Sequence, residues 1–131
     1  MIKENVLTAF SALGFIPEEI DGFCYRFEYE GLTVIYTVED EEAKCITLMA
    51  PDVFDISDDN RVTVLEAMTK LCRKMKYVQP HIMFENQVWL NYQHYLGENE
   101  VTPELIEHMI RVLAISTITI HNIINGNDND D

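Results

Sequence analysis

Apolar and polar residues alternate along two neighbouring stretches in the first third of the chain. The apolar positions of 23–30 and 32–38 are Phe23, Tyr25, Phe27, Tyr29, Leu32, Val34, Tyr36 and Val38. A period of two predicts strands that turn one face toward a core. Between them, Glu30-Gly31 favours a tight hairpin turn. Because residues 44–50 alternate in the same way, we predict a three-stranded antiparallel meander.

Three longer stretches place apolar residues three and four positions apart, which is the spacing of an amphipathic helix. They are residues 2–13, 60–76 and 102–124. Thr102 and Pro103 favour a helix start, since threonine caps free N–H groups and proline fits the first turn. The end of the last stretch is rich in β-branched residues, which favour strands. We nevertheless predict a helix there because the cap and the spacing agree.

Two further alternating stretches, residues 78–85 and 88–96, predict two more strands. We expect a hairpin turn at Asn86-Gln87, between these strands. Residues 51–58 lack a clear period and are predicted to form a loop.

The predicted element order is therefore α-β-β-β-α-β-β-α. This order indicates a single α+β domain with an antiparallel sheet over residues 1–124. A chain of 131 residues is long enough to bury one core without disulfides or metals. Residues 125–131 are predicted to form a disordered acidic tail.

The second face of the predicted sheet is the candidate functional surface. It carries apolar and aromatic residues on the parity opposite to the core: Ile35, Met49, Met83, Trp89 and Tyr95. If the helices cover only the first face, these side chains form a surface typical of protein partners. In the alternative interpretation, the helix at 60–76 lies across the second face and buries it.

The charge balance narrows the classes of partner. The chain has 9 Lys and Arg against 23 Asp and Glu, a net charge of −14. Nucleic-acid binding depends on basic residues, so we expect none, and anionic membranes are disfavoured for the same reason. The three cysteines are not arranged in pairs, which predicts neither disulfides nor a zinc site. No secretory signal or membrane span is evident, so a cytoplasmic location is expected.

One stretch resembles a calcium-binding loop. In DISDDNRVTVLE, residues 55–66, oxygen-bearing side chains fall at several ligand positions and Glu66 falls at the twelfth. Asn60 stands where glycine is usual, and a strand rather than a helix precedes the stretch. The alternative is that Ser57 or Asp58 simply caps the following helix.

No pattern in the sequence indicates catalysis, and no cofactor is expected. The chain has no nucleophile elbow, phosphate loop or dinucleotide fingerprint. His81 and His94 could be neighbours across two strands, but no carboxylate is predicted beside them. The acid run at 39–42 is expected at a solvated turn, where a carboxyl pKa is not easily shifted. We therefore predict that the protein is not an enzyme.

Three stretches, FSALGF, YRFEYEGLTVIY and VQPHIMFENQVWLNYQHYL, carry a characteristic hydrophobic pattern and turn placement. Over about residues 8–122, this pattern resembles the YbjN-like family of proposed bacterial sensory transduction regulators. The element order is also similar to that of type III secretion chaperones, whose fold this family is thought to share. The resemblance implies a small acidic protein, often dimeric, that holds other polypeptides. It implies no catalytic residues.

Two functional hypotheses follow. The first is a non-enzymatic protein-binding module, a chaperone-like or regulatory adaptor that grips another protein or a second copy of itself, as in a homodimer. The surrounding acids would then steer basic segments toward the apolar surface. The second is a ligand- or metal-responsive regulatory domain built around residues 55–66 or around a pocket between helix and sheet.

Overall fold

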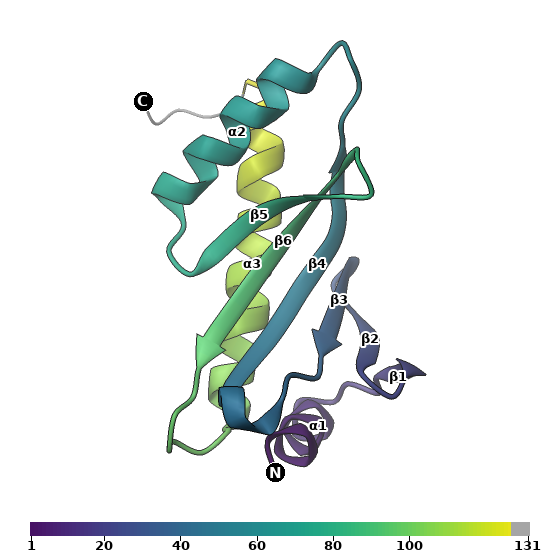
Figure 1. The fold of residues 1–131 in the computed structure, drawn as a ribbon, viewed down its shortest axis with the longest axis vertical. Coiled ribbons are helices and arrows are strands. Elements are labelled where there is room, and N and C mark those ends of the chain that lie inside the picture. The colour runs from purple at the N-terminus through teal and green to yellow at the C-terminus, as the bar shows by residue number, and fades with distance from the viewer. Residues whose placement is uncertain (127–131) are drawn as a thin grey trace.

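Figure 1 shows a computed structural model of the chain, in which residues 1–126 are described. The helices are α1 (Ile2–Ala12), α2 (Arg61–Lys74) and α3 (Pro103–Ile124), with a short 3-10 helix η1 at Glu41–Ala43. The strands are β1 (Glu18–Asp21), β2 (Cys24–Tyr29), β3 (Leu32–Thr37), β4 (Cys45–Asp55), β5 (Val78–Met83) and β6 (Gln87–Tyr95).

The strands form one sheet in the order β1-β2-β3-β4-β6-β5, and every neighbouring pair is antiparallel. The hairpin between β2 and β3 turns at Glu30-Gly31, where both residues have positive φ angles of 48° and 85°. Such angles fit a tight turn whose twist matches that of its strands. The predicted α+β class with an antiparallel sheet is confirmed.

Two strand predictions were incomplete. β1 was not predicted, because all four of its residues are exposed and no apolar alternation marks it. β4 continues to Asp55 through the region predicted as a loop, since Phe54 and Asp55 pair with Val88 and Gln87 of β6. The register shifts between Ala50 and Phe54, so a β-bulge interrupts the ladder there. This bulge, which contains Pro51, hid the continuation of the strand.

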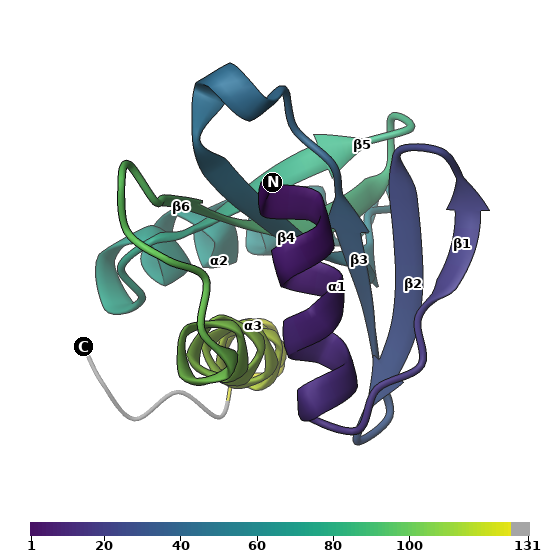
Figure 2. The same ribbon diagram turned by 90° about the horizontal axis from the view of Figure 1, so that it is seen from below.

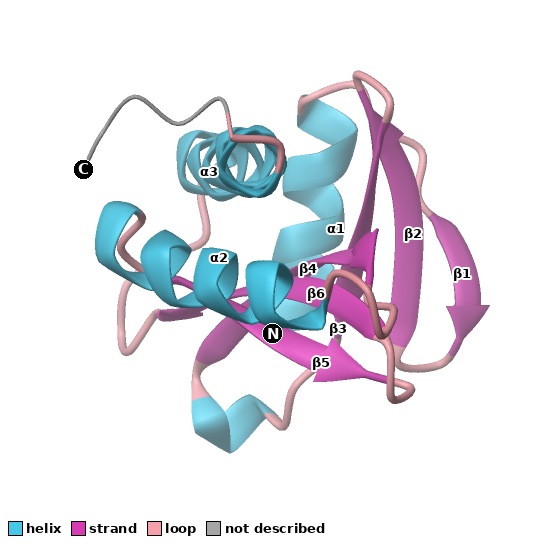
Figure 3. Ribbon diagram, turned by 90° about the horizontal axis from the view of Figure 1, so that it is seen from above, coloured by secondary structure: helices cyan, strands magenta, loops and turns pink. Residues whose placement is uncertain are grey.

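All three helices lie on the same side of the sheet, as Figures 2 and 3 show from opposite ends. α3 packs on β4, β5 and β6, α1 packs on α3, and α2 packs on α3 and β5. The core residues of the sheet are those of the predicted inner parity, among them Tyr25, Phe27, Val34, Tyr36, Ile46, Leu48, Val88 and Leu90. The alternative in which the helix at 60–76 covers the second face is wrong.

Of the two helix caps predicted from the sequence, the cap of α3 is confirmed and the cap of α2 is corrected. Thr102 caps α3 by accepting a hydrogen bond from the N–H of Leu105 at 3.1 Å, as predicted. α2 is not capped by Ser57 or Asp58. It begins after Asn60, whose Oδ1 accepts from the N–H of Ser57 at 2.7 Å. Of the predicted tail, Asn125 and Gly126 form the turn that ends α3, and residues 127–131 lie outside the described residues.

Candidate protein-binding face

The face of the sheet away from the helices, here the open face, carries the five residues chosen from the sequence. Ile35 lies directly opposite Met49, and Met49 lies opposite Asn91. Trp89 is two residues from Asn91 along β6 and therefore on the same face. On this parity Met83 pairs with Gln87 and Tyr95 pairs with Cys45.

These five residues do not form one compact cluster. Ile35 and Met49 are half-buried neighbours at the centre of the sheet. Met83 and Trp89 lie toward the β5–β6 hairpin. Tyr95 is 70% exposed and lies six residues from Trp89, at the opposite end of β6. A strand rises about 3.3 Å per residue, so roughly 20 Å separates the two ends. A partner that touches all five would need an extended shape.

Amide side chains surround a shallow hollow on the open face. Tyr77, Gln79, Asn91 and Gln93 line a space of about 250 Å³. The Oδ1 atom of Asn91 is buried and has no hydrogen-bond partner among the described residues. A buried polar atom without a partner costs about 1–3 kcal/mol. The part of the open face at the start of β5 and the middle of β6 is therefore polar but uncharged.

An aromatic pair, with one ring exposed and the other half-buried, lies at the β5–β6 hairpin. Phe84 is 70% exposed, and its ring centroid lies 5.8 Å from that of Trp89. The Trp89 indole N–H donates to Oε1 of Gln87 at 2.9 Å, which fixes the indole in place. The alternation placed Phe84 on the inner face of a strand. Instead, its φ of 53° takes the chain out of the strand into a turn and leaves the ring exposed.

Two carboxylates lie on the part of β4 that pairs with this end of β6. The register shift of β4 places Asp52 in the bulge opposite Trp89, and Asp55 pairs with Gln87. Asp52 has a φ of 42°, which is uncommon for a residue other than glycine. Partial desolvation, together with a hydrogen bond with Asp55 and its negative charge, raises the pKa of Asp52. Asp55 is thus held close enough to oppose the ionisation of Asp52.

Both edges of the sheet are poorly suited to accept another strand. β5, at one edge, contains Pro80, which has no N–H to donate. β1, at the other edge, is four residues long and carries Glu18, Glu19 and Asp21. Short, charged or proline-containing edge strands resist pairing with other chains. A partner is therefore better accommodated on the open face than at an edge.

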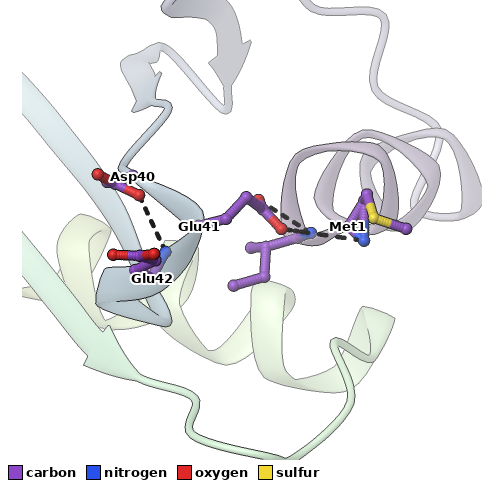
Figure 4. Close-up of polar contacts among 5 residues, drawn as sticks. Met1, Asp40, Glu41 and Glu42 are labelled. Carbon is purple, nitrogen blue, oxygen red and sulfur yellow. Dashed lines mark hydrogen bonds and ion pairs between the residues drawn. The ribbon is translucent and has the colours of Figure 1, made fainter.

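Two acids of the run at 39–42, Asp40 and Glu41, have a structural role. In Figure 4, the Glu41 carboxylate reaches the start of α1 and accepts from the N–H of Ile2 at 3.1 and 3.2 Å. The amino group of Met1 lies 3.9 Å from the same carboxylate. Within η1, the Asp40 side chain accepts from the N–H of Glu42. Glu41 therefore caps a helix far away in the sequence, which local patterns did not predict.

The remaining sequence candidates are not brought together. Within residues 1–126 no group of three or more His, Cys, Asp or Glu side chains is placed to hold a metal ion. In the stretch resembling a calcium loop, Asn60 uses its side chain to bond Ser57 and the carbonyl of Asp55. His81 pairs with Trp89 on the open face, whereas His94 pairs with the buried Ile46, so these histidines lie on opposite faces.

No helix of the described chain combines the length and apolar character needed to cross a bilayer.

No family model matches the chain, and no match was found among curated proteins. Its fold does match solved structures. YbjN, a proposed transcription regulator from E. coli, has a TM-score of 0.68 at 11% identity, covering 95% of this chain and 93% of that one.

A second match is an uncharacterised protein from Methanothermobacter thermautotrophicus. Its TM-score is 0.59 at 12% identity, with 96% of this chain and 98% of that one covered. At such identities the likeness shows a shared fold alone. The YbjN-like fold expected from the sequence is confirmed, while membership of that family stays a prediction.

Proposed function

We propose that this protein is a regulatory or chaperone-like adaptor that binds a segment of another protein on its open face. The observation that carries the proposal is the one-sided packing of the sheet: all three helices cover one face. The other face keeps Ile35 and Met49 at its centre, and Trp89 toward the β5–β6 hairpin, only half-buried. Apolar and aromatic side chains on an uncovered sheet face are typical of partner surfaces. The shared fold with a proposed regulator agrees with this role.

The partner is expected to be basic. Two copies of a chain with a net charge of −14 repel each other, so a second copy is the less favourable occupant. A basic segment would be attracted to the acidic surroundings of the open face and would bind faster at low salt. Because both sheet edges resist pairing, the segment would cross the open face by side-chain contacts.

The test is selection from a random peptide display library, followed by affinity measurement on the best peptides. Met49→Glu places a charge at the centre of the open face. Ile118→Glu makes the same kind of change on α3, where Ile118 is 62% exposed. We expect peptides rich in Lys and Arg, bound at least about tenfold more weakly by Met49→Glu, a loss of about 1.4 kcal/mol. Ile118→Glu should bind them like the wild type.

Thermal melting of each variant shows whether the fold is retained before affinities are compared. Equal binding by the wild type and Met49→Glu, with the fold intact, would show that the open face is not the partner surface. Failure to select any peptide that binds the wild type would count against a peptide-binding adaptor altogether.

A further inference from the structure

The corner of the open face at the β5–β6 hairpin combines the exposed Phe84 ring and the half-buried Trp89 ring with acids that form no ion pair within residues 1–126. We call this group the aromatic corner and define it as Asp52, Asp55, Phe84, Glu85 and Trp89. The rings of Phe84 and Trp89 lie against each other at 5.8 Å between centroids and 58° between planes. Asp52 lies opposite Trp89 in the β4 bulge, and Asp55 pairs with the residue that holds the indole.

Among residues 1–126, the acids of the aromatic corner have no cationic partner. Asp52, Asp55 and Glu85 form no ion pair within residues 1–126, in contrast to Glu18 and Glu107, which pair with arginines. Three acids without an ion-pair partner in the described chain make the potential negative at this end of the open face. A ligand of this corner therefore binds more favourably if it carries a positive charge.

The backbone conformation of two residues at the aromatic corner also favours a binding site there. Phe84 and Asp52 have φ angles of 53° and 42°. Left-handed conformations cost a residue with a side chain about 1–2 kcal/mol. β-Bulges frequently re-aim side chains near binding sites. Here the bulge places Asp52 opposite Trp89 in the strand register, and the turn leaves exposed the Phe84 ring that would otherwise face inward.

The chemistry of these groups selects one class of ligand. Tryptophan is the best aromatic partner for a cation, through the negative face of its ring. Carboxylates supply acceptors, and an arginine guanidinium supplies five N–H donors on a planar group that also stacks on rings. A neutral or anionic group would leave the acids uncompensated. An arginine or lysine side chain satisfies the rings and the carboxylates together.

We propose that the aromatic corner is the specificity-determining subsite of the open face, and that it binds an arginine or lysine side chain of an extended basic partner segment. This inference rests on the proposed function. It adds that one cationic side chain, held by Trp89, Phe84 and the two aspartates, fixes the partner on the sheet. The half-buried Ile35 and Met49 then contact the apolar residues that flank it.

The chain contains a single tryptophan, so its fluorescence reports directly on the aromatic corner. The probe is the peptide acetyl-Arg-Gly-Arg-amide, titrated into the full chain at low ionic strength. Its counterpart has citrulline in place of both arginines, which keeps the shape and removes the charge. We expect a saturable change in Trp89 emission with the arginine peptide and an apparent Kd at least about tenfold weaker with citrulline.

Matched variants separate a local site from general charge. Asp52→Asn combined with Asp55→Asn removes two charges at the corner, and Glu39→Gln combined with Glu42→Gln removes two charges elsewhere. We expect the first pair to weaken arginine-peptide binding at least about fivefold and the second pair by less than about twofold. Phe84→Asn, which tolerates the left-handed backbone, should also weaken binding.

Three outcomes would overturn the inference. They are no saturable response of Trp89, an equal response to the citrulline peptide, or equal weakening by both double variants. A response to calcium chloride in place of the peptide would instead make the corner a metal site. If display-selected peptides bind through Met49 while Trp89 does not respond to the arginine peptide, the adaptor function is supported and the arginine subsite is contradicted. If no display-selected peptide binds and Trp89 does not respond, both proposals are contradicted.

Discussion

At the scale of single residues, Asp52 joins an uncommon backbone conformation to a carboxyl that resists ionisation. Its raised pKa arises from partial desolvation and from the hydrogen bond and charge of Asp55. A carboxyl whose pKa is higher in the folded state ionises more easily when the chain unfolds. Such a group therefore favours the folded state at low pH and costs stability as the pH rises through its folded-state pKa.

We accordingly predict that Asp52→Asn raises the melting temperature near neutral pH. The amide removes the carboxyl that is costly to ionise, and asparagine tolerates a φ of 42° better than most residues. The gain should shrink as the pH is lowered below the ordinary aspartate pKa of about 3.9, where the carboxyl is protonated in both states. Thermal melts at several pH values measure this difference.

Asp58→Asn is the matched control, because it removes the same charge from an exposed loop residue. If both variants show the same gain at every pH, the effect comes from net charge and not from the Asp52–Asp55 pair. A gain for Asp52→Asn that grows as the pH falls would contradict the predicted sign.

Residue parity in the sequence identified the buried side of the sheet but failed where strands end. Val34 and Tyr36 are buried as the alternation predicted, whereas Phe23 and Phe84 continue the same alternation and are about 70% exposed. A period of two describes a side chain's direction only while the backbone stays extended. Phe23 follows the Asp21-Gly22 turn, and at Phe84 the positive φ redirects the side chain.

At the scale of elements, the start of α1 depends on a residue from another part of the chain. α1 has no side-chain cap of its own, and the Glu41 carboxylate of η1 accepts from the N–H of Ile2. A carboxylate at a helix N-terminus satisfies a free donor and interacts favourably with the helix dipole. This contact ties α1 to the connection between β3 and β4.

We predict that Glu41→Ala lowers the free energy of unfolding by about 0.5–1 kcal/mol, since it removes this capping carboxylate. Chemical denaturation at low salt measures the change. Glu42→Ala is the control, because the Glu42 carboxylate makes no hydrogen bond within residues 1–126. Equal losses in the two variants would show that Glu41 acts through the charge of the turn and not through the cap.

The existence of most elements could be read from sequence, but not their pairing. α3 was recognisable despite its β-branched residues, since Thr102 caps it and buried Ile106, Met109 and Leu113 keep the helical period. β1 could not be recognised, because an exposed edge strand has no buried face to impose alternation. It exists through its hydrogen bonds with β2, which local patterns do not encode.

At the scale of the whole molecule, the net charge of −14 acts on both stability and binding. Like charges on a compact chain repel each other, which destabilises the folded state. The ion pairs of the described residues, such as Arg26–Glu18 and Arg111–Glu107, involve exposed side chains. Exposed ion pairs contribute little to the stability of the folded state, so salt that screens them lowers that stability only slightly.

We therefore predict that the melting temperature rises when NaCl is increased from about 10 mM to about 300 mM, as the Debye length falls from about 30 Å to below 8 Å. Scanning calorimetry at neutral pH measures this change. The same increase should weaken the binding of the arginine peptide, because that attraction is screened too. A melting temperature that falls with salt would show that attractive ion pairs outweigh the repulsion.

The sequence by itself determined the apolar faces, the helical periods, the main turns and the acidic charge. These properties are local or additive, and so they can be read along the chain. Only the tertiary structure decided which face α2 covers, and it alone brought Asp52 opposite Trp89 and Glu41 to the start of α1. Those contacts depend on strand register and helix packing between distant segments, where the competing arrangements share the same local pattern.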